Sequence, residues 1–485
     1  MKLCNIGNRF DYEMEKLIRL YLPFEKIEVL HTKSDGERLA VVSIEETNAG
    51  LSLYTKLCLS GKKAERKKEI EKRFPEKETE LMLAGMLADC FFDITDYAPQ
   101  WGILTGVRPA RLLRNKIKEL GEEKAREYFK NVLRVSDSKL DLCLAAAAED
   151  KIISLSGPMS YSLYFSVPFC PSRCSYCSFV SHSVDKAGEL IPAYVEKLCE
   201  ELKYTAQIAQ SLGLKLETVY MGGGTPTTLN ENQLYTVLDT VARHFDLSNV
   251  REFTVEAGRP DTVSPGKLDI IKQCGADRIS INPQTLDDGV LKAIGRRHTE
   301  ADFYKAFKLA EKAGFNAVNT DLIAGLPTDT VEGFKNTVDK IIKLSPQSVT
   351  VHSLSMKRAS TLTERGEFPE IDAGRNACEM VDYARHQLTL NGILPYYMYR
   401  QSKTVGNLEN VGYAKEGFEG LYNVYIMDET HTVLACGASA VTKLREPNGN
   451  KIKRIFNFKY PYEYIGRFEE QLKRKSDIEL FYKDL

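Results

Sequence analysis

Between residues 160 and 355, short apolar runs alternate six times with longer amphipathic segments. The apolar runs are YSLYFSV (161–167), ETVYMG (217–222), EFTVEA (252–257), DRISIN (277–282), NAVNTDLIAG (316–325) and SVTVHSL (348–354). Segments between them, such as ADFYKAFKLAEKAG and VEGFKNTVDKIIKL, repeat apolar residues at helical spacing. This alternation predicts strands of a parallel sheet whose connecting helices cover its faces. Because no G-x-G-x-x-G follows any run, the pattern favours an α/β fold with an incomplete (β/α)6 barrel over an open dinucleotide-binding sheet.

The sequence changes in character on both sides of this region, and three domains are expected. Residues 1–155 are interpreted as an N-terminal accessory α+β domain, 156–365 as the barrel and 366–485 as a small C-terminal α+β domain. In the first, the charge run KKAERKKEIEKRFPEKETE (62–80) predicts a solvated helix face. In the last, we expect a helix over 373–391, a hairpin over 422–441 and a helical tail.

Charge and hydropathy exclude several classes of protein. The 66 Lys and Arg residues nearly balance the 67 Asp and Glu residues, whereas nucleic-acid-binding domains usually carry a basic excess, so no nucleic-acid partner is expected. No apolar run approaches the length of a membrane span, and the N-terminus has no signal-peptide pattern. We therefore expect a cytoplasmic protein, in which most of the eleven cysteines are buried as small apolar residues.

Three cysteines depart from that scattered distribution. Cys170, Cys174 and Cys177 lie within eight positions, directly after the first predicted strand. Three thiolates on one loop can bind three irons of a cubane cluster and leave the fourth iron open. Structural zinc usually needs a second close pair of ligands, and none follows here. The spacing thus predicts an iron–sulfur site, with zinc and simple burial as the alternatives.

The other chemically distinctive residues follow the later strands, at the end of a barrel where active sites lie. They are the GGGTP turn (222–226), Glu256, Gln284, Arg296, Asp321 and His352. Each has a structural alternative: a tight turn for the glycines, a surface ion pair for Glu256, a hydrogen-bonding role for His352. Asp321 lies inside an apolar run, where a carboxylate is costly unless it is paired or binds a ligand.

The run Y-x3-P-F-C-x3-C-x-Y-C, then GGGTP, a strand-end Glu, a Gln, an Arg and DLI-x-GLP occur here in order. Together they resemble the radical S-adenosyl-L-methionine (SAM) enzymes, and among them the oxygen-independent coproporphyrinogen III dehydrogenase group, which includes haem chaperones. The resemblance covers residues 160–355 most strongly. It implies a 4Fe-4S cluster on Cys170, Cys174 and Cys177 whose open iron binds SAM. Electron transfer then cleaves SAM to methionine and a 5′-deoxyadenosyl radical.

The same resemblance implies roles for further residues. In that family two SAM molecules bind, and by similarity Tyr164, Gly223 and Glu256 would face the first. Those facing the second would be Tyr176, Gly224, Thr225, Gln284, Arg296 and Asp321. The implied reaction is oxidative decarboxylation of coproporphyrinogen III to protoporphyrinogen IX, with an external electron donor such as a flavodoxin or ferredoxin. Its substrate is a tetracarboxylate, and the candidate guanidinium contacts are Arg259, Arg296, Arg358 and Arg400.

Two departures from the dehydrogenases leave the substrate open. Phe179 stands where those enzymes have a fourth cysteine, and the haem chaperones share this phenylalanine. The N-terminal region is also unlike the short arm of those dehydrogenases. This long region, AGRP (257–260) and YRQ…GNLENVGY (399–413) resemble the HemZ-type subgroup. Three hypotheses follow: a porphyrinogen decarboxylase, a haem-binding chaperone, or a radical SAM enzyme that acts on another substrate.

Overall fold

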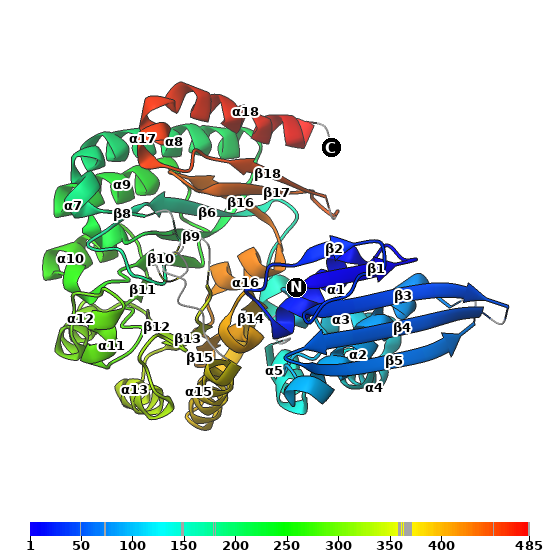
Figure 1. Ribbon diagram of the computed structural model, residues 1–485. Coiled ribbons are helices and arrows are strands. Elements are labelled where there is room, and N and C mark those ends of the chain that lie inside the picture. The colour runs from blue at the N-terminus through cyan, green and yellow to red at the C-terminus, as the bar shows by residue number, and fades with distance from the viewer. Residues whose placement is uncertain are drawn as a thin grey trace. The chain divides into compact units, whose positions relative to one another are not determined.

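The computed structural model describes residues 1–48, 50–71, 74–146, 150–177, 179, 181–356, 360, 362, 371–449 and 451–483, without the side chains of 371 and 372. The chain forms two compact units (Figure 1). Unit 1 comprises residues 1–147 with 399–409, and unit 2 comprises 148–398 with 410–485. The division into three domains stays a prediction.

Unit 1 is built on a five-stranded sheet in the order β2-β1-β3-β4-β5. Its strands are β1 (Lys2–Ile6), β2 (Glu28–Leu30), β3 (Leu39–Thr47), β4 (Gly50–Leu59) and β5 (Lys62–Ile70). The β1 strand pairs in parallel with β2 and β3, and the other pairings are antiparallel. Helices α1 (Asp11–Tyr21) and α2 (Glu76–Thr95) bury apolar side chains with this sheet in one core. The remaining helices are α3 (Pro109–Leu120), α4 (Glu122–Glu127) and α5 (Asp137–Ala146).

The charge run at 62–80 does not begin as a helix, so that prediction was wrong for its first half. Residues 62–70 form β5, which pairs antiparallel with β4 along its whole length, and the helix begins only at Glu76. Main-chain hydrogen bonds to β4 outweigh the helix preference of the lysines and glutamates. Lysine on an edge strand also discourages pairing with another chain.

Residues 399–409 belong to unit 1 through buried polar contacts. Trp101 and Lys139 both donate to Glu409, with nitrogen–oxygen distances of 2.7 and 2.8 Å. Arg400 donates to the carbonyl of Leu104 at 2.6 Å and lies over the Trp101 ring. Burial lowers the pKa of Arg400 to about 10. Arg400 is therefore enclosed by unit 1: its two Nη atoms donate to main-chain carbonyls there, and its Nε is buried with no partner in the described structure.

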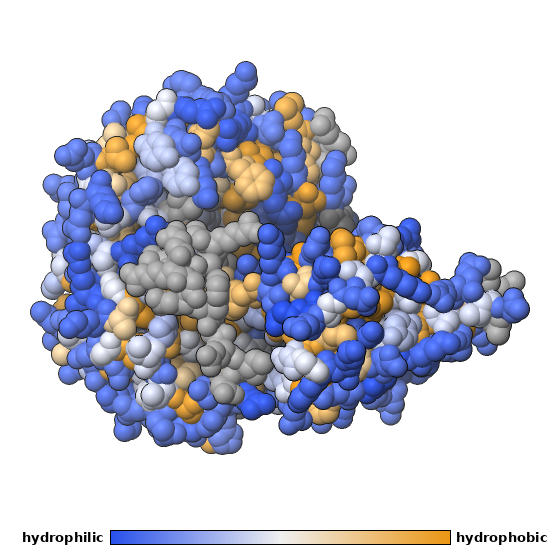
Figure 2. Space-filling model, viewed as in Figure 1, coloured by the Kyte–Doolittle hydropathy of each residue, from blue (hydrophilic) through white to orange (hydrophobic). Residues whose placement is uncertain are grey.

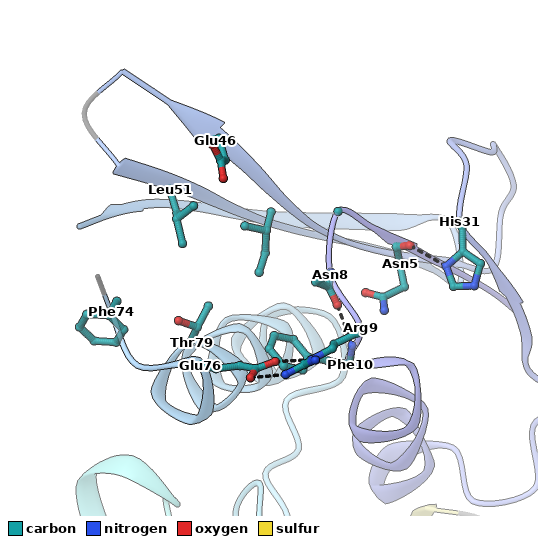
Figure 3. A pocket seen from close by; sticks show the side chains of 12 residues that line it. Asn5, Asn8, Arg9, Phe10, His31, Glu46, Leu51, Phe74, Glu76 and Thr79 are labelled. Atoms are coloured by element: carbon teal, nitrogen blue, oxygen red, sulfur yellow. Dashed lines mark hydrogen bonds and ion pairs between the residues drawn. The ribbon is translucent and has the colours of Figure 1, made fainter. Parts of the chain in front are cut away.

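A groove of about 700 Å³ opens in unit 1 between the sheet and the first residues of α2 (Figure 3). Its walls are partly apolar, with Phe10, Ile44 and Leu51, and an Arg9–Glu76 ion pair lies beside it. None of the site residues predicted from the sequence lines this groove.

Unit 2 contains the six predicted strands, paired in parallel in chain order. They are β6 (Ser160–Val167), β9 (Lys215–Gly223), β10 (Glu252–Glu256), β11 (Arg278–Ser280), β12 (Ala317–Ala324) and β13 (Ser348–Ser353). The connecting helices lie along the outer side of the curved sheet (Figure 1). They are α8 (Ile191–Ser211), α9 (Glu231–His244), α10 (Pro265–Gln273), α11 (Asp288–Ala293), α12 (Glu300–Lys312), α13 (Val331–Leu344) and α15 (Ile371–Leu390). The alternation read from the sequence is confirmed.

The C-terminal region extends this sheet at both edges, to eleven strands in all. At one edge, β15 (Glu409–Ala414) pairs antiparallel with β13 and is followed in the sheet by β14 (Leu394–Arg400). At the other, β16 (Thr432–Cys436) pairs in parallel with β6, followed by β17 (Val441–Arg445) and β18 (Ile452–Phe456). No pairing among the described strands closes the sheet into a ring. Helices α17 (Pro461–Gly466) and α18 (Phe468–Lys483) form the predicted helical tail.

The predicted hairpin over 422–441 was half wrong. Its first arm is helix α16 (Leu421–Asp428), and its second arm is β16, which instead pairs antiparallel with β17, a strand that begins at Val441. The first turn of α16 is held by Glu252 of β10, whose carboxylate accepts hydrogen bonds from the backbone N–H groups of Leu421 and Tyr422. A buried carboxylate at a helix N-terminus favours helix over strand, and only tertiary structure supplies it here.

In the described part of the chain, no helix combines the length and apolarity that crossing a membrane requires. Hydrophilic side chains predominate on the face shown in Figure 2.

Candidate cofactor site

The three clustered cysteines lie on a loop that leaves the carboxyl end of β6. A short parallel pairing of β7 (Phe169–Cys170) with β8 (His182–Ser183) brings the two ends of this loop together. All three thiols are free of disulfides; Cys174 is buried, and Cys170 and Cys177 are partly exposed. We call residues 170–177 the cysteine loop. Its fold presents three unbonded sulfurs from one short segment.

The GGGTP turn lies against the start of the cysteine loop. Gly224 N–H donates to Val167 O at 2.8 Å, and Thr225 N–H donates to Phe169 O at 2.7 Å. The Thr225 hydroxyl lies 3.5 Å from the Cys170 sulfur. A Cβ on Gly224 would lie 2.6 Å from Phe169 O, and Gly223 has a φ of 108°. The glycines are thus required for close approach to the protein's own backbone, whether or not a ligand approaches as well.

Replacing Gly224 with alanine is expected to destabilise unit 2 and displace Cys170. The added Cβ meets backbone atoms of 167 and 169, which cannot move away as a flexible side chain could. Forcing an extra carbon into such a packed position costs about 1–3 kcal/mol. The free energy of unfolding, measured by chemical denaturation, should fall. The iron content after anaerobic reconstitution should fall as well. Gly466→Ala is the matched control, because its Cβ would meet no atom within 4 Å; equal stability of the two variants would contradict the expectation.

Arg296 and Tyr176 meet beside the cysteine loop. The Arg296 guanidinium donates to Asn282 O at 2.5 Å, to Gly258 O at 3.3 Å and to the Tyr176 hydroxyl at 3.2 Å. Its Nε is buried with no hydrogen-bond partner in the described structure. Burial raises the pKa of Tyr176, so this phenol stays protonated. A buried donor without a partner is costly, and a bound ligand would relieve that cost.

Gln284 and Asp321 lie on neighbouring segments of the sheet. Gln284 has a φ of 71°, and its backbone N–H donates to Asp321 O at 3.0 Å. The Asp321 carboxylate accepts from Asn319 at 2.7 Å and lies 3.8 Å from His352 Nε2. The carboxylate expected to need a partner in its apolar strand therefore has two.

Three stacked tyrosines line the same end of the sheet. The ring centroids of Tyr220 and Tyr422 are 4.4 Å apart, and each is 6.2 Å from that of Tyr164. The Tyr220 hydroxyl donates to Glu256 at 2.5 Å. Tyr220 and Tyr422 were not predicted. Tyr220 shares the face of β9 that carries Gly222, so strand alternation could have found it, whereas nothing local marks Tyr422.

Burial raises the pKa of Glu256 to about 7, from an ordinary value of 4.5. The Tyr220 hydrogen bond opposes this shift and the Asp321 charge reinforces it. Between those two pKa values the folded chain binds more protons at this carboxyl than the unfolded chain does. The contribution of Glu256 to the free energy of unfolding is therefore largest below the unfolded pKa and falls as pH rises to about 7.

We expect the Glu256→Gln variant to lack this decline of the free energy of unfolding with rising pH, because glutamine has no proton to release. Denaturant unfolding of both proteins from pH 4.5 to 7.5 measures it: the stability of the wild type relative to the variant should decline across that range. A constant difference would show that the pKa of Glu256 is the same in the folded and the unfolded chain.

The residues present fit a 4Fe-4S cluster with bound SAM. Each of the three thiolates would bind a different iron of the cubane, so the three sulfurs stand farther apart than the ligands of a single ion. Among the described residues, no three His, Cys, Asp or Glu side chains converge as the ligands of one metal ion would. Besides Arg296 Nε, the hydroxyl of Ser175 within the loop is buried without a partner. Free thiols with unsatisfied donors around them are what an anionic cluster and an amino-acid ligand would satisfy.

Comparison with known proteins agrees with this site. Residues 164–341 match the family model of the radical SAM superfamily. The oxygen-independent coproporphyrinogen-III oxidase-like protein HemZ of Bacillus subtilis is 33% identical over 445 residues, covering 90% of this chain and 88% of that protein. The heme chaperone HemW of Lactococcus lactis is 33% identical over 326 residues, covering 66% and 79%. The structure of coproporphyrinogen III oxidase (HemN) from Escherichia coli aligns with a TM-score of 0.52 at 20% identity, covering 66% of this chain and 72% of that one.

The fold and the cysteine loop define a radical SAM protein, and proteins of this superfamily use a 4Fe-4S cluster and SAM. Within it, the chain belongs to the family of the HemZ oxygen-independent coproporphyrinogen-III oxidase-like protein. The expected α/β fold, family and cofactors are thereby confirmed. The roles of individual residues toward SAM stay predictions.

Proposed function

We propose that this protein is an oxidoreductase that oxidatively decarboxylates two propionate side chains of coproporphyrinogen III, giving protoporphyrinogen IX. The observation that carries the proposal is the similarity to the HemZ protein over 90% of this chain, including the N-terminal region. A cytoplasmic location and an external one-electron donor, such as a flavodoxin or ferredoxin, form part of the proposal.

The cluster with SAM would supply a radical able to remove a hydrogen atom from unactivated carbon. Cys170, Cys174 and Cys177 would hold the cluster. Glu256 and Arg296 would orient SAM through a carboxylate acceptor and a buried donor. The stacked rings of Tyr164, Tyr220 and Tyr422 would wall the site and exclude water, which protects a reactive radical.

Binding of the substrate's carboxylates needs cationic groups, and the candidate arginines differ in what they can offer. Arg400 is enclosed in unit 1, and Arg259 is enclosed by the cysteine loop and Asp261. Arg358 lies outside the described residues. Arg296 keeps one unpartnered nitrogen, Nε. Among the described residues, Arg400 also has an unpartnered Nε, but that nitrogen is buried within unit 1. Arg296 contacts Tyr176 of the cysteine loop, and we assign its unpartnered donor to SAM and not to the substrate.

Haem binding without turnover is the second candidate. Relatives named heme chaperone HemW support it, and so does Phe179, which is 68% exposed where a fourth cysteine would stand. An exposed phenylalanine beside the cysteine loop can pack against a flat apolar ligand.

Anaerobic incubation of the reconstituted protein with SAM, dithionite and coproporphyrinogen III separates the two. Formation of protoporphyrinogen together with 5′-deoxyadenosine supports decarboxylation. Stoichiometric haem binding with no porphyrin product supports the haem-chaperone function and contradicts the proposed decarboxylation. Production of 5′-deoxyadenosine alone, with neither porphyrin product nor haem binding, indicates a different substrate.

A further inference from the structure

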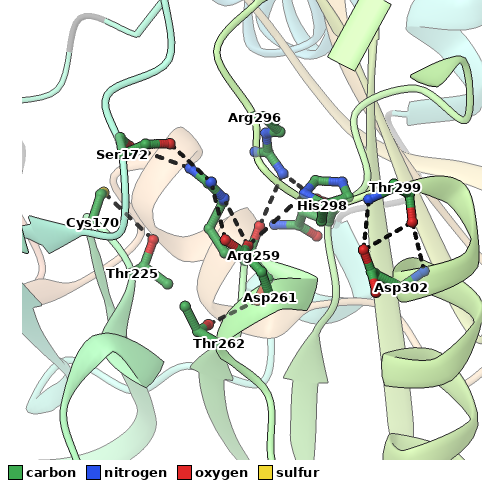
Figure 4. Close-up of polar contacts among 12 residues, drawn as sticks. Cys170, Ser172, Thr225, Arg259, Asp261, Thr262, Arg296, His298, Thr299 and Asp302 are labelled. Carbon is green, nitrogen blue, oxygen red and sulfur yellow. Dashed lines mark hydrogen bonds and ion pairs between the residues drawn. The ribbon is translucent and has the colours of Figure 1, made fainter. Parts of the chain in front are cut away.

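Arg259 lies in the AGRP turn that follows β10, and its side chain is buried against the cysteine loop (Figure 4). Only 2% of the residue is exposed. Its guanidinium donates to the backbone carbonyl of Ser172 at 3.3 Å and to the Ser172 hydroxyl at 3.0 Å. The same Nη1 lies 3.7 Å from the sulfur of Cys174. One side chain thus contacts both the loop backbone and one of the three clustered sulfurs.

The loop is also docked on the turn that precedes Arg296. The Ser172 hydroxyl donates to Gly295 O at 2.9 Å, and Ser175 N–H donates to Ile294 O at 3.0 Å. Ser172 therefore joins Arg259 to that turn. These contacts hold the middle of the loop, whereas the β7–β8 pairing holds its first residue, Cys170, beside Ser183.

The charges around Arg259 are few. Asp261 accepts from its Nε at 3.2 Å and its Nη2 at 3.4 Å, and is the one carboxylate that contacts this guanidinium among the described residues. His298 lies 4.0 Å from Asp261. Burial and the charges of Arg296 and Arg259 lower the pKa of His298 to about 3, so this imidazole is neutral at pH 7. The Arg259 charge is therefore shared between Asp261 and the Cys174 sulfur.

We propose that Arg259 is a positioning residue of the cluster: it docks the cysteine loop through Ser172 and directs a positive charge at the Cys174 sulfur, which raises the reduction potential of the cluster, with Asp261 as the counter-ion that moderates this effect. The inference rests on the cluster site described above and does not depend on which substrate the protein takes.

The physical basis is electrostatic. One-electron reduction adds a negative charge to a site that three thiolates already make anionic. Hydrogen bonds to the sulfurs and nearby positive charge favour the reduced form, and so raise the potential. Because Arg259 is buried, solvent screens its charge less than it would at the surface.

The test is a redox titration of the reconstituted protein without SAM or substrate, followed by electron paramagnetic resonance of the reduced cluster. Arg259→Met removes the charge and is expected to shift the midpoint to more negative values. A tenfold change in the ratio of reduced to oxidised cluster at a set potential corresponds to about 59 mV for one electron. Asp261→Asn removes the counter-charge and is expected to shift the midpoint the opposite way. Arg259→Lys keeps the charge and should shift it less than Met does.

The decisive result is a midpoint shift of opposite sign in Arg259→Met and in Asp261→Asn, because disruption of the loop alone would not produce opposite shifts. Arg297→Met is the matched control: Arg297 is exposed, pairs with Asp185, and should leave the midpoint unchanged. An unchanged midpoint in Arg259→Met, or an unchanged or lowered one in Asp261→Asn, overturns the inference. If Arg259→Met retains no iron, the direction of the midpoint shift in Asp261→Asn decides whether the inference holds. A wild type that forms no 4Fe-4S signal defeats the cluster assignment instead.

Discussion

Replacing Cys174 with alanine is expected to abolish the iron–sulfur cluster. Cys174 is the buried member of the three, and its sulfur lies 3.7 Å from the Arg259 guanidinium. Two thiolates would leave two irons of the cubane without a protein ligand. SAM can bind only one open iron, so the cluster would lack a ligand. Iron and acid-labile sulfide per chain, measured after anaerobic reconstitution, should fall to background, and with them the brown colour and any cleavage of SAM.

Cys199→Ala is the control for that experiment. Cys199 is also buried, but it lies on α8, with its sulfur 3.8 Å from Thr236 O. Its loss removes one small buried group and should leave the iron content unchanged. Full iron and colour in Cys174→Ala would show that the cysteine loop is not the cluster site.

Replacing Glu201 with alanine is expected to cost about 3–5 kcal/mol of stability, because it leaves a buried lysine without its counter-ion. Glu201 on α8 lies 3.0 Å from the Lys475 ammonium of α18, and neither side chain is exposed. Its carboxylate also accepts from Tyr464 at 2.6 Å, from Asn457 at 2.8 Å and from the Gly437 N–H at 2.6 Å. The variant breaks all of these contacts, and denaturant unfolding measures the loss.

The cost should be partly recovered in the double variant Glu201→Ala, Lys475→Met, which removes the stranded charge. Glu332→Ala is a surface control, since Glu332 pairs with Lys335 while 84% exposed, and such pairs contribute about 0–1 kcal/mol. A loss in Glu201→Ala no larger than that of Glu332→Ala would contradict the prediction.

The Glu201 network bears on the cofactor site because it supports the strand that carries the cysteine loop. Tyr194 of α8 donates to Ser166 O of β6 at 2.7 Å and accepts from the Ala438 N–H at 2.9 Å. A Cβ on Gly437 would lie 2.7 Å from that same Ser166 oxygen. The C-terminal strand β16 and the residues that follow it are thus packed tightly against β6. The contact at Ser166 lies four residues before Cys170, the first cluster cysteine.

The periodicity of apolar residues and the spacing of the cysteines are local properties of the sequence. They were enough to predict much of the fold and the cluster site. The six parallel strands follow from apolar runs of strand length that alternate with helices. The cluster site follows from three cysteines on one loop, because thiolates at most seven residues apart can reach one cubane wherever the loop lies. The strand-end position of Glu256 follows likewise, since all parallel strands end at the same edge of the sheet, whereas Asp321 lies inside β12.

Where long-range contacts compete with local preference, the sequence misled or was silent. Residues 62–70 form a strand because β4 offers a complete ladder of hydrogen-bond partners, and 421–428 form a helix because Glu252 caps it from another strand. Tyr422 joins the tyrosine stack, and Arg259 contacts the Cys174 sulfur, through contacts between residues over eighty positions apart. The sequence by itself thus determined the class of chemistry, because metal ligation needs only a few residues at short spacing. Which side chains surround that chemistry was decided by the tertiary structure alone, because packing and burial depend on neighbours that no local pattern encodes.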